Sequence, residues 1–172
     1  MKTTPDAKVS NLLRFGMVMD LDYNMDKSEF YGRGPIENYI DRKASQNIGI
    51  YKQTADQQFF PYIRPQETGT KSDIRWWKQT TAEGLGFCIS AVNNYFDACA
   101  LHYNISDLDE GDNKDQRHSP EVPKSKYTEL SINLAHFGLG GENSWGAWPL
   151  QQHRLPYQDM TFTFHLTPLG VK

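Results

Sequence analysis

The chain has 172 residues, which suits a single domain, and a formal net charge of −3 with both signs interspersed along it. This charge pattern excludes the basic stripe that nucleic-acid binding requires, and no apolar run approaches the roughly 20 residues of a membrane-spanning helix. Two cysteines are too few for a disulfide framework, so we expect Cys88 and Cys99 to be buried free thiols, although they could also face each other across a hairpin.

The chain opens on a polar segment without the pattern of a secretory signal peptide. We interpret residues 1–11 as a lead-in or as residues added for expression, and residues 12–172 as the domain. Apolar and polar residues then alternate in several segments, which predicts half-buried strands. No stretch longer than about ten residues has a helical period. The predicted strands, in chain order, are Leu13–Leu21, Ile48–Lys52, Leu85–Val92, Leu130–Leu134 and Met160–Leu166.

Turn-forming residues separate these segments, so we predict an all-β fold, an antiparallel sandwich or barrel. The first conspicuous connection is Tyr31–Arg42, which contains two glycines and a proline. Glu37 and Asp41 could form the carboxylate pair that glycoside hydrolysis uses. We favour the alternative that Arg42 or Arg33 neutralises them and locks the turn. The residues expected to build this structural motif are Gly34, Pro35, Glu37, Asn38, Asp41 and Arg42.

Two adjacent tryptophans, Trp76 and Trp77, follow in a further strand-like segment. Neighbouring side chains on a strand point to opposite faces, so one indole is expected in the core and the other at a surface or under another domain. Three charged residues precede these tryptophans. We interpret Arg64, Glu67 and Arg75 as a buried or interfacial ion network, with sugar contact as the alternative.

The long polar connection between residues 107 and 126 suggests a functional or mobile loop. Its acidic run does not match the EF-hand calcium loop, because Gly111 stands at the fifth ligand position and not the sixth. We expect a solvated loop and no metal site, since the histidines lie at no metal-ligand spacing. The acidic residues are Asp107, Asp109, Glu110, Asp112 and Asp115, and the histidines are His102, His118, His136, His153 and His165.

The glycine-rich segment Gly138–Trp148 follows the fourth predicted strand. Glycines permit close backbone approaches and positive φ, so such a loop can present Trp145 at a surface. A presented indole suits the C–H-rich face of a pyranose. The residues alone leave a second interpretation open, in which Trp145 and Trp148 fill the core.

Four segments together resemble the small-chain domain of bacterial β-galactosidases of glycoside hydrolase family 2, over about Leu13 to Leu169. They are Tyr31–Arg42, Tyr62–Glu67, Leu108–Glu110 and Gly138–Trp145. The resemblance implies a β-sandwich of the galactose mutarotase-like supersandwich type, which we expect to be truncated at its N-terminus in this chain. It implies a parent enzyme, a retaining β-galactosidase acting on terminal β-D-galactosides, whose catalytic glutamates lie on a TIM barrel outside this chain.

Further expectations follow from the same resemblance. The fragment alone should be inactive, and its partners should be the parent's other domains, with no nucleic acid or membrane partner. The parent's magnesium and sodium sites belong to other domains, so no cofactor is expected here; the compartment stays open between bacterial cytoplasm and periplasm. Trp145 would form an apolar platform at the sugar site, supported by Gly140, Gly141 and Ser144, although Glu142 and Asn143 stand where two aspartates are common.

Two other functions stay open. An independent carbohydrate-binding module would recognise galactosides without the parent. A mutarotase-like isomerase would need a histidine and a carboxylate in one cleft, for which His102, His136 and Glu37 are the candidates.

Overall fold

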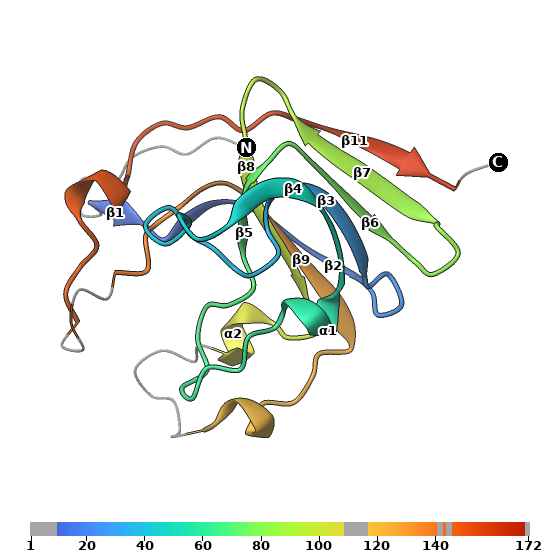
Figure 1. Ribbon diagram of the computed structural model, residues 1–172, viewed down its shortest axis with the longest axis horizontal. Coiled ribbons are helices and arrows are strands. Elements are labelled where there is room, and N and C mark those ends of the chain that lie inside the picture. Colours follow the sequence, from blue (N-terminus) through green and yellow to red (C-terminus); the bar gives the residue numbers. More distant parts are fainter. Residues whose placement is uncertain (1–9, 109–116, 141–142, 144–145, 171–172) are drawn as a thin grey trace.

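Two antiparallel sheets packed face to face make up the protein in the computed structural model, which describes residues 10–108, 117–140, 143 and 146–170 (Figure 1). One sheet has five strands in the order β11-β7-β6-β3-β4, and the other has four in the order β2-β9-β8-β5. A small sheet pairs β1 with β10. The predicted all-β antiparallel sandwich is therefore confirmed. None of the described helices is long and apolar enough to cross a membrane.

The elements are short, and connections carry much of the described chain. Their bounds are β1 Asn11–Leu12, β2 Arg14–Asp22, β3 Lys27–Gly34, β4 Asn47–Thr54, α1 Ala55–Gln58, β5 Lys71–Ile74, β6 Trp76–Thr80, β7 Gly86–Ala91, β8 Phe96–Leu101, α2 Ile105–Leu108, the 3₁₀ turn Ser119–Glu121, β9 Tyr127–His136, the 3₁₀ turn Gln151–His153, β10 Leu155–Pro156 and β11 Phe164–Leu169.

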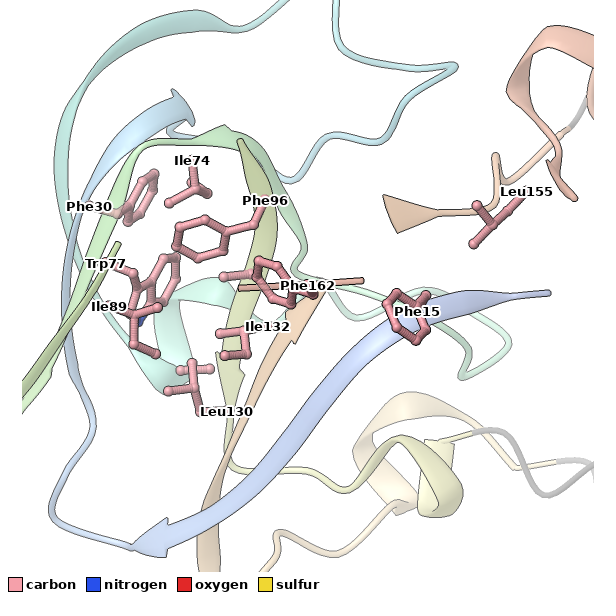
Figure 2. Close-up of a cluster of buried hydrophobic side chains, with 12 residues drawn as sticks. Phe15, Phe30, Ile74, Trp77, Ile89, Phe96, Leu130, Ile132, Leu155 and Phe162 are labelled. Atoms are coloured by element: carbon pink, nitrogen blue, oxygen red, sulfur yellow. The ribbon is translucent and has the colours of Figure 1, made fainter. Parts of the chain in front are cut away.

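The main core lies between the two sheets. Trp77 is fully buried and stacks on Phe30 with ring centroids 4.9 Å apart, whereas Trp76 points to the outer face and is partly exposed. The two tryptophans thus lie on opposite faces, as the strand geometry predicted. Figure 2 shows Trp77 beside Phe30 and Ile89, with Phe162 filling the space toward the four-stranded sheet.

The predicted strand Leu13–Leu21 is confirmed as β2, but Leu13 is 75% exposed. A β-bulge between Phe15 and Gly16 shifts the pairing with β9. A Cβ atom at Gly16 would lie 2.2 Å from the carbonyl oxygen of Ile132, so the close approach of the strands at the bulge requires glycine.

Two other predicted strands differ in detail. On β4, Ile50 is 62% exposed because it lies on the outer face of the five-stranded sheet, beside the exposed Tyr31 of β3. The last strand begins at Phe164 and not at Met160, because Phe162 instead fills the core before the strand starts. Asn11, assigned to the lead-in, pairs with Pro156 as part of β1.

Within the four-stranded sheet, β8 and β9 are largely buried on both faces, whereas Val18 on the outer face of β2 is exposed. The outer face of β8 and β9 packs under the segments around α1 and α2, which Figure 1 shows on one side of the sandwich. This second cluster contains Cys99, Leu101, Leu108 and Val122. Cys99 lies on β8 while Cys88 lies on β7 of the other sheet, so the alternative of a cysteine pair across one hairpin is wrong; both are free thiols.

Candidate functional site

The connection between β3 and β4 forms a tight turn held by Asn38. The fully buried Asn38 amide donates hydrogen bonds to the carbonyl oxygens of Arg33 and Ile36, both at 3.0 Å. Its Oδ1 accepts from the backbone N–H of Ser72 at 3.0 Å, at the second residue of β5. Gly34–Pro35, at the start of the turn, is a cis peptide bond. Asn38 therefore fastens this turn to the four-stranded sheet.

Glu37 is buried beside Asn38, and its carboxylate accepts four hydrogen bonds. The donors are the Arg42 guanidinium at 2.6 Å, the Gly69 N–H at 2.7 Å, the Thr68 hydroxyl at 3.1 Å and the Tyr62 hydroxyl. A carboxylate so occupied has little capacity left for a substrate. Of the two basic residues considered from the sequence, Arg42 pairs with Glu37, whereas Arg33 pairs with Asp73.

Asp41 brings the turn and the glycine-rich segment together. Its Oδ2 accepts a hydrogen bond from the backbone N–H of Gly140 at 2.8 Å, and it also packs against Gly138. Glu37 and Asp41 thus bind different partners: Glu37 binds Arg42 and the connection between α1 and β5, whereas Asp41 binds the glycine-rich segment. Gly141, Ser144 and Trp145, which the sequence singles out, lie outside the described residues.

The C-terminal end of the glycine-rich segment is exposed. Trp148 is 58% exposed, so it is not the core residue that one interpretation expected. Phe137 contacts its indole edge-on at 5.8 Å, and the Arg154 guanidinium lies 5.4 Å from the ring centroid. Arg154 also donates to the carbonyl oxygen of Pro149 at 2.8 Å. Leu139 and Leu150 are exposed nearby in the chain, so this segment presents apolar surface.

The ion network predicted from Arg64, Glu67 and Arg75 is wrong in its membership. Glu67 pairs with Arg14 of β2, and the His136 Nε2 lies 3.8 Å from the other Glu67 carboxylate oxygen. Arg64 is exposed, and the Arg75 guanidinium lies over Tyr95, 4.1 Å from the ring centroid. Nothing in the sequence signals this network, because β2 and β9 reach Glu67 only through the fold.

Burial alone would raise the pKa of Glu67 and lower that of His136. The nearby His136 imidazole and the charge of Arg14 overcome this for Glu67, whose pKa lies below its ordinary value. Glu67 in turn raises the pKa of His136. Each group therefore favours the charged form of the other, which makes the network a stabilising contact at mildly acidic pH.

A cavity of about 190 Å³ adjoins this network and contains Asp97. Burial, and then the neighbouring charge of Asp73, raise the pKa of Asp97 to about 7, while His136 and Lys43 act in the opposite direction. Asp73 adopts a left-handed backbone conformation with φ of 55° and is paired with Lys43 and Arg33. Asp97 is therefore the acidic group of the cavity that gains a proton in the neutral range.

We expect Asp97→Asn to stabilise the chain at high pH. The pKa of Asp97 is raised in the folded state, so its contribution to stability is greatest at low pH and is lost as the pH rises through about 7. The variant should gain about 1–4 kcal/mol over the unmodified chain between pH 5 and pH 9, measured by urea unfolding. His136 titrates in both proteins, so it enters the comparison only through its interaction with Asp97. Asp20→Asn, at an exposed position, is the control; a constant difference across this range would contradict the prediction.

The three residues considered for isomerase chemistry have separate partners. His102 contacts Asp56 through Nδ1 at 2.9 Å and stacks on Tyr23, His136 lies beside Glu67, and Glu37 binds Arg42. Across the described part of the chain, no three His, Cys, Asp or Glu residues gather as a metal site would need. Within the acidic run, Asp107 lies in α2, and Asp109, Glu110, Asp112 and Asp115 lie outside the described residues.

Comparison with known proteins gives one consistent family. Residues 1–166 match the model of the β-galactosidase small chain. A β-galactosidase of Priestia megaterium is 33% identical over 166 residues, which is 96% of this chain and 16% of that protein. Those of Bifidobacterium adolescentis and Lactobacillus delbrueckii subsp. bulgaricus are 33% and 34% identical over 83% of this chain and 13% of their own length. The chain thus spans about a sixth or less of the curated relatives that it matches.

Proposed function

The chain belongs to the β-galactosidase small-chain family, and we propose that it is the non-catalytic β-sandwich domain of a retaining β-galactosidase that hydrolyses terminal β-D-galactosides. One observation carries the proposal: 83–96% of the chain aligns with a segment that makes up only 13–16% of the length of each of three β-galactosidases. The catalytic glutamates would lie in another domain, the TIM barrel, which would also be the main partner of this sandwich. Trp145 would supply an apolar platform to the galactoside site.

The hydrogen bonds and ion pairs of Glu37 and Glu67 support a non-catalytic role. A retaining glycosidase needs two carboxyl groups about 5–5.5 Å apart that flank the scissile bond. Glu37 is occupied by four donors, and Glu67 is paired with Arg14 and His136. Neither carboxylate has the freedom that a nucleophile or a proton donor needs.

The exposed aromatic surface beside the glycine-rich segment supports the platform. Trp148 and Leu150 are exposed to solvent, whereas Trp77 is fully buried. An aromatic face at a surface is more useful to a sugar or to a neighbouring domain than to this core.

The isolated chain should not hydrolyse nitrophenyl β-galactoside, because it would lack the catalytic glutamates. It should also bind galactose too weakly for calorimetry, weaker than about 1 mM, because one aromatic platform cannot offset the costs of association. The measurements are release of nitrophenol and heat of titration at neutral pH. Turnover by the chain would contradict the non-catalytic role, and micromolar binding would favour an independent carbohydrate-binding module.

The platform itself is tested in a full-length β-galactosidase that carries this chain. Trp145→Ala should raise KM for galactosides roughly five- to thirty-fold, the loss of one buried aromatic contact, with a smaller effect on kcat. Trp76→Ala, at a partly exposed indole on the outer face of the five-stranded sheet, is the matched control. An unchanged KM for Trp145→Ala would remove the platform from the proposal.

A further inference from the structure

Asp41 contacts the glycine-rich segment at two points. It accepts the hydrogen bond from the N–H of Gly140, and its Oδ2 would lie 2.6 Å from a Cβ atom at Gly138. A real side chain at Gly138 would therefore displace the Asp41 carboxylate. On the other side of Gly138, its N–H donates to the carbonyl oxygen of His153 at 2.8 Å. The Asp41 carboxylate thus packs against the backbone of Gly138 and Gly140, at the start of the glycine-rich segment.

The two described ends of the loop also meet at Gly140. This residue has a φ of +73°, which favours glycine, and a Cβ atom there would lie 2.9 Å from the carbonyl oxygen of Ala147 and 3.3 Å from Cδ of Pro149. Residues 140 and 147 therefore lie against each other, and we call this contact the base of the loop. Because Gly140 belongs to both contacts, the bond from Asp41 sets the position of this base relative to the sandwich.

Asp41 itself stands on a well-supported turn. Backbone hydrogen bonds between Tyr39 and Arg42, at 2.8 and 3.3 Å, close the turn around it. Tyr39 is fully buried before it, and Arg42 after it is bound to Glu37. Asn38 ties the same turn to β5. The position of the Asp41 carboxylate is consequently fixed from the sheets, while the glycines of the loop carry no side chains that could fix their own path.

We propose that Asp41 is the positioning residue for the base of the glycine-rich segment, acting through its hydrogen bond to the Gly140 N–H. The inference rests on the proposed function, because the loop affects substrate binding only if Trp145 contacts the galactoside. Asp41 would not touch the sugar. It would act as an acceptor of fixed position, a role for which a neutral amide oxygen of the same shape is sufficient.

The experiment compares Asp41→Ala, Asp41→Asn and Asp41→Glu in the full-length β-galactosidase. Asp41→Ala should raise KM about three- to ten-fold, the effect of one lost hydrogen bond, with kcat changed less than about two-fold. Asp41→Asn should keep KM within about two-fold of the unmodified enzyme, because its Oδ1 accepts the same bond. Asp41→Glu should behave like the alanine variant, because its extra methylene collides with Gly138. Asp20→Ala, at an exposed position, is the control.

A double variant decides whether Asp41 acts through the loop. Asp41→Ala combined with Trp145→Ala should have the KM of Trp145→Ala alone within about two-fold, because the positioned group is already gone. Multiplicative effects, or an unchanged KM in Asp41→Ala with only a lower Tm, would overturn the inference. If Asp41→Ala does not fold, equal KM values for the asparagine and glutamate variants would overturn it. An unchanged KM in Trp145→Ala would instead refute the proposed platform.

Discussion

Replacing Trp77 with alanine is expected to lower the free energy of unfolding by about 3–5 kcal/mol, the range for removing a large aromatic side chain from a core. Trp77 is fully buried and stacks on Phe30 at 4.9 Å. Its indole N–H donates to Oε1 of Gln79 at 2.8 Å, and Gln79 in turn donates to the carbonyl oxygen of Met25 at 2.7 Å. The substitution therefore removes the packing against Phe30 and one of the hydrogen bonds that hold the buried Gln79 side chain.

The adjacent Trp76 provides a matched control of identical chemistry. It is partly exposed on the outer face, where its contacts are the Lys78 ammonium, 4.9 Å from the ring centroid, and the Tyr31 ring. Trp76→Ala should cost about 1 kcal/mol or less. Urea unfolding of the 172-residue chain, followed by circular dichroism, measures both. Equal losses for the two variants would contradict the assignment of faces; if Trp77→Ala does not fold, Trp77→Phe should show a smaller loss of the same kind.

Removing the carboxylate of Glu37 is expected to cost about 1–3 kcal/mol, the penalty for leaving a buried hydrogen-bond donor without its acceptor, because the charged partner Arg42 is half exposed. Glu37→Ala leaves the buried Gly69 N–H without its acceptor, whereas the Thr68 hydroxyl keeps the carbonyl oxygen of Phe60 at 3.1 Å. It also removes the carboxylate through which Tyr62 and Gly69, in the connection between α1 and β5, are bonded to the turn. The unpaired Gly69 N–H carries most of this cost.

Glu29 is the matched control for this measurement. It pairs with Lys52 and Lys78 on the outer face, where solvent screens the charges. Glu29→Ala should cost between 0 and about 1 kcal/mol. The same unfolding experiment compares the two variants. A loss below about 1 kcal/mol for Glu37→Ala would show that the carboxylate is not the structural anchor of the turn, and would reopen a chemical role for it.

The candidate site was only partly predictable. Glycines and the Asp41–Arg42 sequence mark the two segments, but their meeting at Asp41 and Gly140 joins residues 99 positions apart. The Arg14–Glu67–His136 network was missed for the same reason, since its members lie on three separate segments. Charge type and spacing along the chain carry no information on such pairs, because each depends on which strands become neighbours.

The sequence by itself determined the class of the fold and the family. Alternation of apolar residues follows from the two-residue period of a strand, so β2, β7 and the opposite faces of Trp76 and Trp77 could be derived locally. Only the tertiary structure decided which strand faces are buried. Ile50 is exposed because it lies on the outer face of the five-stranded sheet, whereas the polar face of β9 is buried under connections that no local pattern reveals. Burial on the second face of a strand depends on long-range packing, and that is a property of the assembled sandwich.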